Sequence, residues 1–269
     1  MSAVKLPLPD SVVIPMAMHI GAPAKPVVKV GDYVKTGQLI GEPGGFVSAP
    51  IYASVSGTVK KIGEMLGSNG RMMQTVEIES DGLDARWEGI APPKLETMQD
   101  FLDAVRASGL VGLGGAGFPT VKNLDQIKCV IINGAECEPY ITSDTRAMID
   151  YSFDVIAGCR LLQKFLKVPR IVFGIEDNKP ECIARYRELV KNEQNMEVMP
   201  LKAMYPQGGE KVLIYHVTGE KVPEGKLPLD VGAVVLNCTT ISSIARYCRT
   251  GLPLVKKCVT VDGSAVKNH

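Results

Sequence analysis

The sequence lacks three features that would assign a class at once: an excess of charge of one sign, a long apolar run and closely paired cysteines. Its 30 Lys and Arg residues against 29 Asp and Glu give a net charge of +1, whereas nucleic-acid-binding proteins normally show a clear basic excess. No apolar stretch approaches the roughly 18 residues of a membrane span. Residues 1–9 lack the basic start and apolar middle of a signal peptide. We therefore expect no nucleic-acid partner, no direct membrane span and no secretion.

The seven cysteines form no C-x-x-C pair, and the gaps between them are long. This spacing excludes a zinc ribbon and the common iron–sulfur motifs, so no metal site is predicted in this chain. An odd number of scattered thiols fits a reducing compartment, and most of them are expected to be small buried residues. The prediction is a cytoplasmic protein.

The common catalytic motifs are also missing. Neither H-E-x-x-H, G-x-S-x-G nor the P-loop pattern occurs, and the three histidines are His19, His216 and His269. His216 lies in a helical pattern and is interpreted as structural. With no catalytic residue predicted, a bound cofactor should carry any chemistry, while the protein positions it.

The amino-acid composition changes near residue 90. Residues 1–92 are rich in Gly, Val and Pro, with short runs such as Lys25–Val30, Gln38–Gly41 and Ser54–Lys60 separated by turn signals. This pattern predicts an all-β domain, a small barrel or sandwich. Pro92-Pro93 is interpreted as the linker to a second domain.

From Thr97 onward, apolar runs of strand length alternate with helical stripes. The predicted strands are Cys129–Ile132, Ile171–Ile175, Met196–Leu201 and Val231–Leu236. The helical stripes are Phe101, Leu102 and Val105; Val155, Cys159, Leu162 and Leu166; Ile183, Tyr186, Leu189 and Val190; and Val212, Ile214, Tyr215 and Val217. The alternation predicts an α/β domain at 93–253 with a mostly parallel, covered sheet. Cys258–Gly263 is predicted as one more strand.

A glycine-rich stretch, Gly112-Leu-Gly-Gly-Ala-Gly-Phe-Pro-Thr120, is the first candidate binding segment. Four glycines let backbone approach a ligand closely, and the following Pro-Thr suits a helix start, where N–H groups favour phosphate. Lys122 could add a positive charge. An ordinary tight turn is an equally good interpretation of this loop taken alone.

Polar loops follow each predicted strand, and they are the second candidate. They are residues 133–140, 176–178, 205–211 and 237–240. Ligands of open α/β sheets bind beyond the carboxyl ends of the strands. Each loop by itself is more often simple turn chemistry. If the four converge, they form a site suited to a polar heterocycle and a sugar-phosphate.

Three motifs together carry a family resemblance: Gly112–Thr120, Asn133-Gly-Ala-Glu-Cys-Glu-Pro139 and Tyr205–Lys211. In this order they resemble the RnfC family of the Rnf electron-transport complex, which is similar to the flavin-bearing NADH-oxidising subunit of respiratory complex I. The stretches Val28–Ile40 and Ala53–Val59 resemble that family's N-terminal domain.

The resemblance implies three parts: a lipoyl-like barrel-sandwich hybrid at 1–92, a complex I flavoprotein-like FMN/NADH-binding α/β domain at 93–253, and the start of a truncated β-grasp (SLBB) domain at 254–269. Carrier domains of the lipoyl fold present a lysine on a hairpin, but residues 42–49 contain none. Covalent lipoylation or biotinylation is therefore disfavoured, and a docking or structural role is expected for this domain.

The resemblance also implies non-covalent FMN with NAD(H) stacked upon it. The residues that match the family's cofactor-binding positions are Gly112, Gly114, Gly115, Gly117, Phe118, Lys122, Asn133, Glu136, Glu138, Tyr205, Gly208, Gly209, Glu210, Asn237 and Thr239. Among them, Asn237 and Thr239 match the loop that holds the flavin phosphate. A carboxylate at Glu136 or Glu138 beside the nucleotide would favour NAD over NADP and lower the flavin potential.

The implied function is that of an NADH-dependent oxidoreductase subunit, not active alone. It would exchange electrons between NAD(H) and iron–sulfur centres, and thus indirectly with ferredoxin, beside other Rnf-type subunits on the inner face of the cell membrane. The [4Fe-4S] clusters are expected only in a C-terminal region that this chain does not contain.

Three alternatives stay open. The chain could serve a related soluble reductase of the proline reductase or cobalamin reductase type. It could be a docking or assembly module without flavin, because Lys122 stands one residue nearer the glycine motif than in the family. A nucleotide-binding enzyme of another class is the weakest alternative, because the sequence lacks a P-loop and a catalytic set.

Overall fold

The computed structural model of the chain describes residues 3–67, 70–111, 127–264 and 266. It contains two compact units. We call them the β unit (residues 4–111 and 246–257) and the α/β unit (residues 1–3, 112–245 and 258–269). The β unit thus extends past the boundary at residue 92 that the change in composition predicts.

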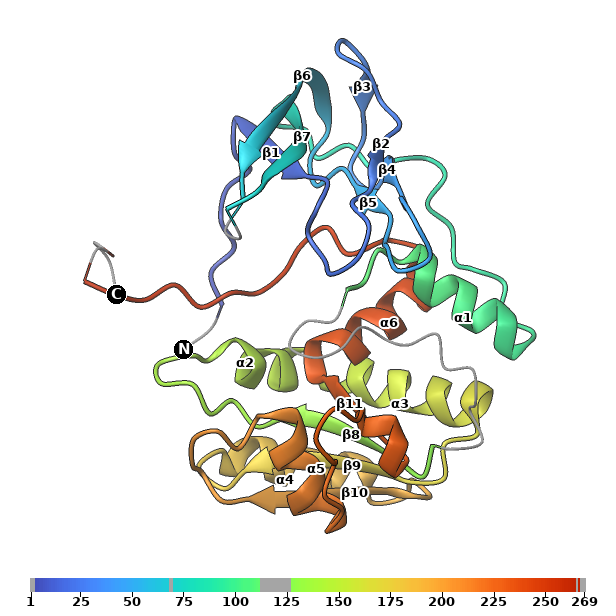
Figure 1. The fold of residues 1–269 in the computed structure, drawn as a ribbon, viewed down its shortest axis with the longest axis vertical. Helices are drawn as coiled ribbons and strands as arrows, with labels where there is room; N and C mark the ends of the chain where they lie inside the picture. The colour runs from blue at the N-terminus through green and yellow to red at the C-terminus, as the bar shows by residue number, and fades with distance from the viewer. Residues whose placement is uncertain (1–2, 68–69, 112–126, 265, 267–269) are drawn as a thin grey trace. The chain divides into compact units, whose positions relative to one another are not determined.

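Two antiparallel sheets build the β unit (Figure 1). One contains β1 (Ser11–Pro15), β7 (Met72–Ser80), β6 (Gly57–Leu66) and β3 (Tyr33–Val34), in that order. The other contains β2 (Lys25–Pro26), β4 (Leu39–Glu42) and β5 (Ile51–Tyr52). Their buried aliphatic side chains form one core that includes Ile14, Met16, Ile40, Val59, Val76 and Ile78. This is the barrel-sandwich architecture that the sequence predicts.

Helix α1 (Met98–Ala107) also belongs to the β unit. Thr97 and Asp100 form a capping box at its start, and the helix buries Phe101, Ala104 and Val105. The hydroxyl of Tyr52 donates to the carbonyl of Ala107. The sequence predicts this helix correctly but assigns it to the second domain, because a change in periodicity shows where helices begin and not where a core divides.

The α/β unit is built on a parallel sheet in the order β10-β9-β8-β11 (Figure 1). The strands are β8 (Cys129–Gly134), β9 (Ile171–Glu176), β10 (Met196–Leu201) and β11 (Ala233–Asn237). The chain moves from β8 outward to β10 and then returns to place β11 on the other side of β8. The strand order therefore reverses between β8 and β11, and such a switch point is where doubly wound sheets bind ligands.

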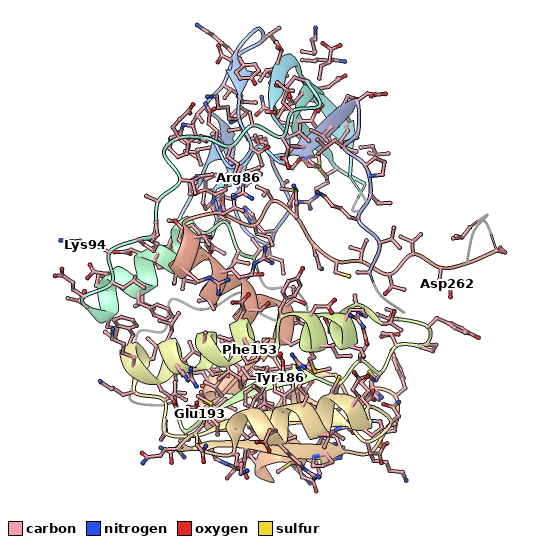
Figure 2. The ribbon with its side chains drawn as sticks, turned by 180° about the vertical axis from the view of Figure 1, so that it is seen from behind. Arg86, Lys94, Phe153, Tyr186, Glu193 and Asp262 are labelled. Carbon is pink, nitrogen blue, oxygen red and sulfur yellow. The ribbon has the colours of Figure 1, made fainter. Side chains whose placement is uncertain are left out.

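Helices cover both faces of this sheet. On one face, α5 (Glu210–Thr218) buries Leu213, Ile214 and Val217 against side chains of the strands, while Tyr215 is exposed. The opposite face is covered by helices that include α3 (Ser152–Leu166) and α4 (Pro180–Val190). The ring of Tyr186 on α4, labelled in Figure 2, is fully buried with its centroid 5.1 Å from that of Phe173 on β9. The mostly parallel, covered sheet is thus confirmed.

Three local features differ from the sequence predictions. Helix α2 (Ser143–Asp150) is not predicted, because it buries only Ala147 and Met148 and so shows no stripe. Helix α6 (Cys238–Thr250) begins directly after β11, where the sequence suggests a polar loop; its Thr, Ser and Ile residues have low helix propensity. The predicted strand at 258–263 is wrong: this segment is irregular, since no neighbouring strand in the described residues pairs with it.

Among the helices that the structure describes, none combines the length and apolar character needed to span a bilayer.

Gly158 on α3 offers a test of how closely α3 and α6 pack. A Cβ at this position would lie 2.5 Å from the carbonyl oxygen of Ile241 on α6. Replacing glycine by alanine inside a helix normally stabilises it by up to about 1 kcal/mol. We predict that Gly158→Ala instead lowers the free energy of unfolding, measured by urea denaturation.

The control is Ala184→Gly at an exposed position of α4, which should cost the ordinary helix-propensity difference. A stabilised Gly158→Ala variant would show that the two helices do not depend on this close approach.

Candidate functional site

Two asparagines stand side by side at the switch point of the sheet. Asn133 on β8 and Asn237 on β11 are register partners in neighbouring parallel strands, so their side chains leave the same face. Each amide oxygen accepts a hydrogen bond from the backbone N–H two residues later. The distances are 3.0 Å from the nitrogen of Ala135 and 2.8 Å from the nitrogen of Thr239. The two strands therefore end in the same local geometry.

The amide nitrogens of this pair reach outward to different elements. Asn133 Nδ2 donates to the carbonyl oxygen of Gly208 at 3.1 Å, and Asn237 Nδ2 donates to Asp144 Oδ2 at 2.8 Å. Both ends of each amide are thus bound, which fixes its orientation. Within the described residues, one N–H of each amide is left for another acceptor.

The loop after β10 packs tightly on the loop after β8. The backbone nitrogen of Gly208 donates to the sulfur of Cys137 at 3.3 Å. A Cβ on Gly208 would lie 2.4 Å from the carbonyl oxygen of Ala135, so only glycine allows this approach. Tyr205 in the same loop is largely exposed, whereas Gly209 precedes α5 as its N-cap and Glu210 opens the helix.

Glu136 is buried and turned toward the start of α2. Its carboxylate accepts hydrogen bonds from the backbone nitrogens of Asp144 (2.7 Å) and Thr145 (3.1 Å) and from the hydroxyl of Thr145 (2.7 Å). It therefore satisfies N–H groups that a helix cannot satisfy internally, and its charge faces the positive end of the helix dipole. Glu138, two residues on, is exposed.

The loop after β9 joins the same cluster through an ion pair. The ammonium of Lys179 lies 2.7 Å from Glu176 Oε2, and both side chains are nearly buried. The same ammonium donates to the carbonyl oxygen of Glu136 at 3.3 Å. The four polar loops that the sequence predicts to converge thus do so, at the carboxyl ends of the strands.

Burial shifts the pKa of two groups here. It raises the pKa of Glu210, an effect that Lys211 partly offsets. It also raises the pKa of the Cys238 thiol, with a further contribution from the nearby Asp144 carboxylate. A protonated thiol fits its contact with the carbonyl oxygen of Asp144, at 3.7 Å.

The predicted cofactor-binding residues fall into three groups. Gly112, Gly114, Gly115, Gly117, Phe118 and Lys122 lie outside the described residues. Those brought together are Asn133, Glu136, Gly208, Gly209, Glu210, Asn237 and Thr239. Tyr205 and Glu138 lie on the loops but are exposed. The role of each residue toward a ligand stays a prediction.

Sequence reasoning missed the residues that hold the cluster together, namely Asp144, Thr145, Cys137 and Lys179. A signal for the first two exists: Thr142-Ser-Asp-Thr145 is a run of residue types favoured at helix starts. Within the part of the chain that is described, no group of three His, Cys, Asp or Glu side chains is arranged to hold a metal ion.

Glu136 and Glu138 form a matched pair for testing the capping role. We predict that Glu136→Ala lowers the free energy of unfolding by about 2 kcal/mol, because α2 loses three hydrogen bonds at its start. Glu138→Ala, at an exposed position two residues away, should change it little. Urea unfolding followed by circular dichroism measures both. Equal effects of the two substitutions would contradict the capping role.

Glu210 predicts a pH dependence. Burial raises the pKa of Glu210 in the folded protein because it disfavours the charged form. The stability of the fold is therefore highest while this carboxyl is protonated, below its pKa in the unfolded chain of about 4.3. This contribution to stability is lost as the pH rises through the folded-state pKa. Glu210→Gln cannot ionise, so it should raise the midpoint of thermal unfolding relative to the unsubstituted chain at pH 7 more than at pH 4.

The exposed Glu220→Gln should show the same difference from the unsubstituted chain at both pH values. If Glu210→Gln does so as well, ionisation of Glu210 carries no folding cost.

Comparison with known proteins matches a protein family to each part of the chain. Residues 2–83 match the family described as the RnfC barrel sandwich hybrid domain, and residues 105–246 match the Nuo51 FMN-binding domain. The NAD+-reducing [NiFe]-hydrogenase in its H2-reduced state aligns over 56% of this chain and 30% of its own chain. That alignment has 23% identity and a TM-score of 0.47, and no assignment rests on it.

Two relatives match over nearly the whole chain. The C component of the Na(+)-translocating ferredoxin:NAD(+) oxidoreductase complex of Acetobacterium woodii is 45% identical, over 97% of this chain and 60% of the relative. The counterpart from the proton-translocating complex of Clostridium ljungdahlii is 44% identical, over 97% of this chain and 59% of the relative. The chain thus spans about three fifths of these relatives' length. With both domains matched in this order, the chain belongs to the RnfC family.

Proposed function

We propose that this chain binds FMN and NAD(H) and transfers electrons between them and iron–sulfur centres of an ion-translocating ferredoxin:NAD oxidoreductase complex. The observation that supports this most directly is the pair of oriented amides at the β8–β11 switch point, within a domain of the FMN-binding family. The relatives are named as components of such complexes.

The donor set of the site fits FMN. FMN presents the polar edge of its ring system and a phosphate, and both accept hydrogen bonds from protein donors. Asn133 and Asn237 each offer one N–H, and α6 begins immediately after Asn237 with its positive end at the same loop. The proposal assigns Asn237 and Thr239 to the phosphate and Asn133 to the ring side.

The flavin, when bound, supplies hydride acceptance from NADH and release of electrons one at a time, which no side chain supplies. The chain's own residues hold and orient it. Gly208 keeps the loop after β10 against the loop after β8, so the wall of the site is fixed before a ligand arrives. The proposal keeps the glycine-rich segment 112–117 as the second phosphate-binding element.

The carboxylates of the site are arranged so that they do not repel an anionic ligand strongly. Glu136 is neutralised locally by the start of α2, and Glu176 by Lys179. Glu210 lies beside the proposed nucleotide loop, and burial makes its ionisation harder. The exposed Glu138 is the carboxylate proposed to disfavour the additional phosphate of NADP, so the proposal keeps NAD(H) as the dinucleotide.

The partners follow from the relatives. We infer that other subunits of the complex carry electrons onward and bring the chain to the inner face of the membrane, with ferredoxin reached through them. Because the sequence has no C-x-x-C pair, the proposal places the [4Fe-4S] clusters outside residues 1–269.

A titration of the purified chain with FMN tests the proposal. We predict saturable binding, seen as a change in flavin fluorescence, and loss of the flavin absorption band when NADH is added anaerobically. Asn133→Leu keeps the side-chain size but removes both hydrogen bonds of the side-chain amide, so it should weaken FMN binding by about tenfold.

Asn192→Leu, at an exposed position after α4 and outside the four loops, is the control and should bind FMN as the unsubstituted chain does. Absence of FMN binding by the unsubstituted chain would overturn the proposal. Equal affinities of the two variants would remove Asn133 from the site.

A further inference from the structure

Asp144, the second residue of α2, connects the two loops at the switch point. Its carboxylate accepts a hydrogen bond from Asn237 Nδ2 at 2.8 Å and a longer one from the hydroxyl of Thr239 at 3.4 Å. Its backbone nitrogen donates to Glu136 Oε1 at 2.7 Å. A single residue thus contacts the loop after β8 through its backbone and the start of α6 through its side chain.

The contact with Asp144 determines which way the Asn237 amide points. The oxygen of this amide accepts from the nitrogen of Thr239 and caps α6, because Asn237 directly precedes the helix. The nitrogen faces the carboxylate of Asp144. A backbone N–H only donates and an ionised carboxylate only accepts, so a flipped amide would face mismatched partners at both ends.

Asn133 shows what is particular about this arrangement. Its amide has the same orientation, but its nitrogen donates to a backbone carbonyl, that of Gly208. Asn237 instead uses a charged side chain. A carboxylate is the stronger hydrogen-bond acceptor, but it also brings negative charge to the start of α6. An acidic residue in the first turn of α2 is favourable in itself, so what distinguishes Asp144 is that its carboxylate also accepts from Asn237 and Thr239.

We propose that Asp144 is a positioning residue for the phosphate end of FMN. It holds Asn237 so that α6 stays capped and the second N–H of the amide points to the phosphate. The proposal rests on the function proposed above. Asp144 is not among the site residues predicted from the sequence. Since the backbone bond to Glu136 is independent of the side chain, substitutions at 144 leave the cap of α2 in place.

The test compares FMN with riboflavin, which lacks the phosphate. Both are titrated into the full chain and into Asp144→Ala and Asp144→Asn variants, with flavin fluorescence as the readout. We expect Asp144→Ala to weaken FMN binding by about tenfold, the effect of one lost charged hydrogen bond, and to leave riboflavin binding within about twofold. The ratio of the two affinities is the quantity that a merely structural role would not move.

Asp144→Asn separates position from charge. Its amide oxygen can still accept from Asn237 Nδ2, so it should restore the preference for FMN that Asp144→Ala loses. Asp150→Ala, at the other end of α2 and paired with Arg146, is the control for the loss of an acidic residue from this helix and should keep that preference.

The remaining outcomes decide against the inference. Tighter FMN binding by Asp144→Ala would show that the charge at 144 outweighs its positioning. Equal loss of FMN and riboflavin would show a structural role only. Equal loss in Asp144→Asn and Asp144→Ala would show that placement of Asn237 is not what matters. If the unsubstituted chain binds FMN and Asp144→Ala keeps the full preference for FMN over riboflavin, the positioning role of Asp144 is wrong but the proposed function stands. If the unsubstituted chain binds no FMN, the proposed function is wrong as well.

Discussion

The unsatisfied N–H groups at the start of α2 are the constraint on which the candidate site depends. A helix cannot pair its first backbone donors internally, and leaving them buried without partners costs free energy. Glu136 satisfies two of them from the loop after β8. Because this bond fixes α2, it also fixes Asp144, which orients Asn237 on the neighbouring strand. One capping interaction thus aligns two loops that are about a hundred residues apart in the sequence.

The topology explains why this alignment falls at the site. β8 and β11 are the first and last strands of the sheet along the chain, yet they are neighbours. Helices after β8 and after β11 both start at this edge, so the space between them is lined by strand ends, a loop and helix starts. Such places combine donors with positive helix ends and suit anionic ligands. The same geometry would be absent if β11 were added beyond β10.

The sequence predicts β8 and β9 well because they are nearly continuous apolar runs, as strands covered on both faces must be. It places the polar loops 133–140, 205–211 and 237–240 after predicted strands, and the family resemblance then singles out Asn133, Gly208 and Asn237 within them. It fails where structure depends on partners instead of periodicity. Helix α2 buries only two residues, and α6 has weak helix propensity, so both depend on contacts that no local pattern reveals. Asp144 is invisible for the same reason: its role exists only once α2 is placed.

The interpretation of the acidic residues changes most between sequence and structure. From the sequence, Glu136 is either a solvated turn residue or a group beside the flavin. In the structure its charge is directed at a helix end instead of solvent, and Glu176 is held by a nearly buried lysine. Carboxylates at this sheet edge therefore act first as connectors between loops. Their negative charge is offset within the protein, which is the condition under which an acidic cluster can border a phosphate site without opposing it.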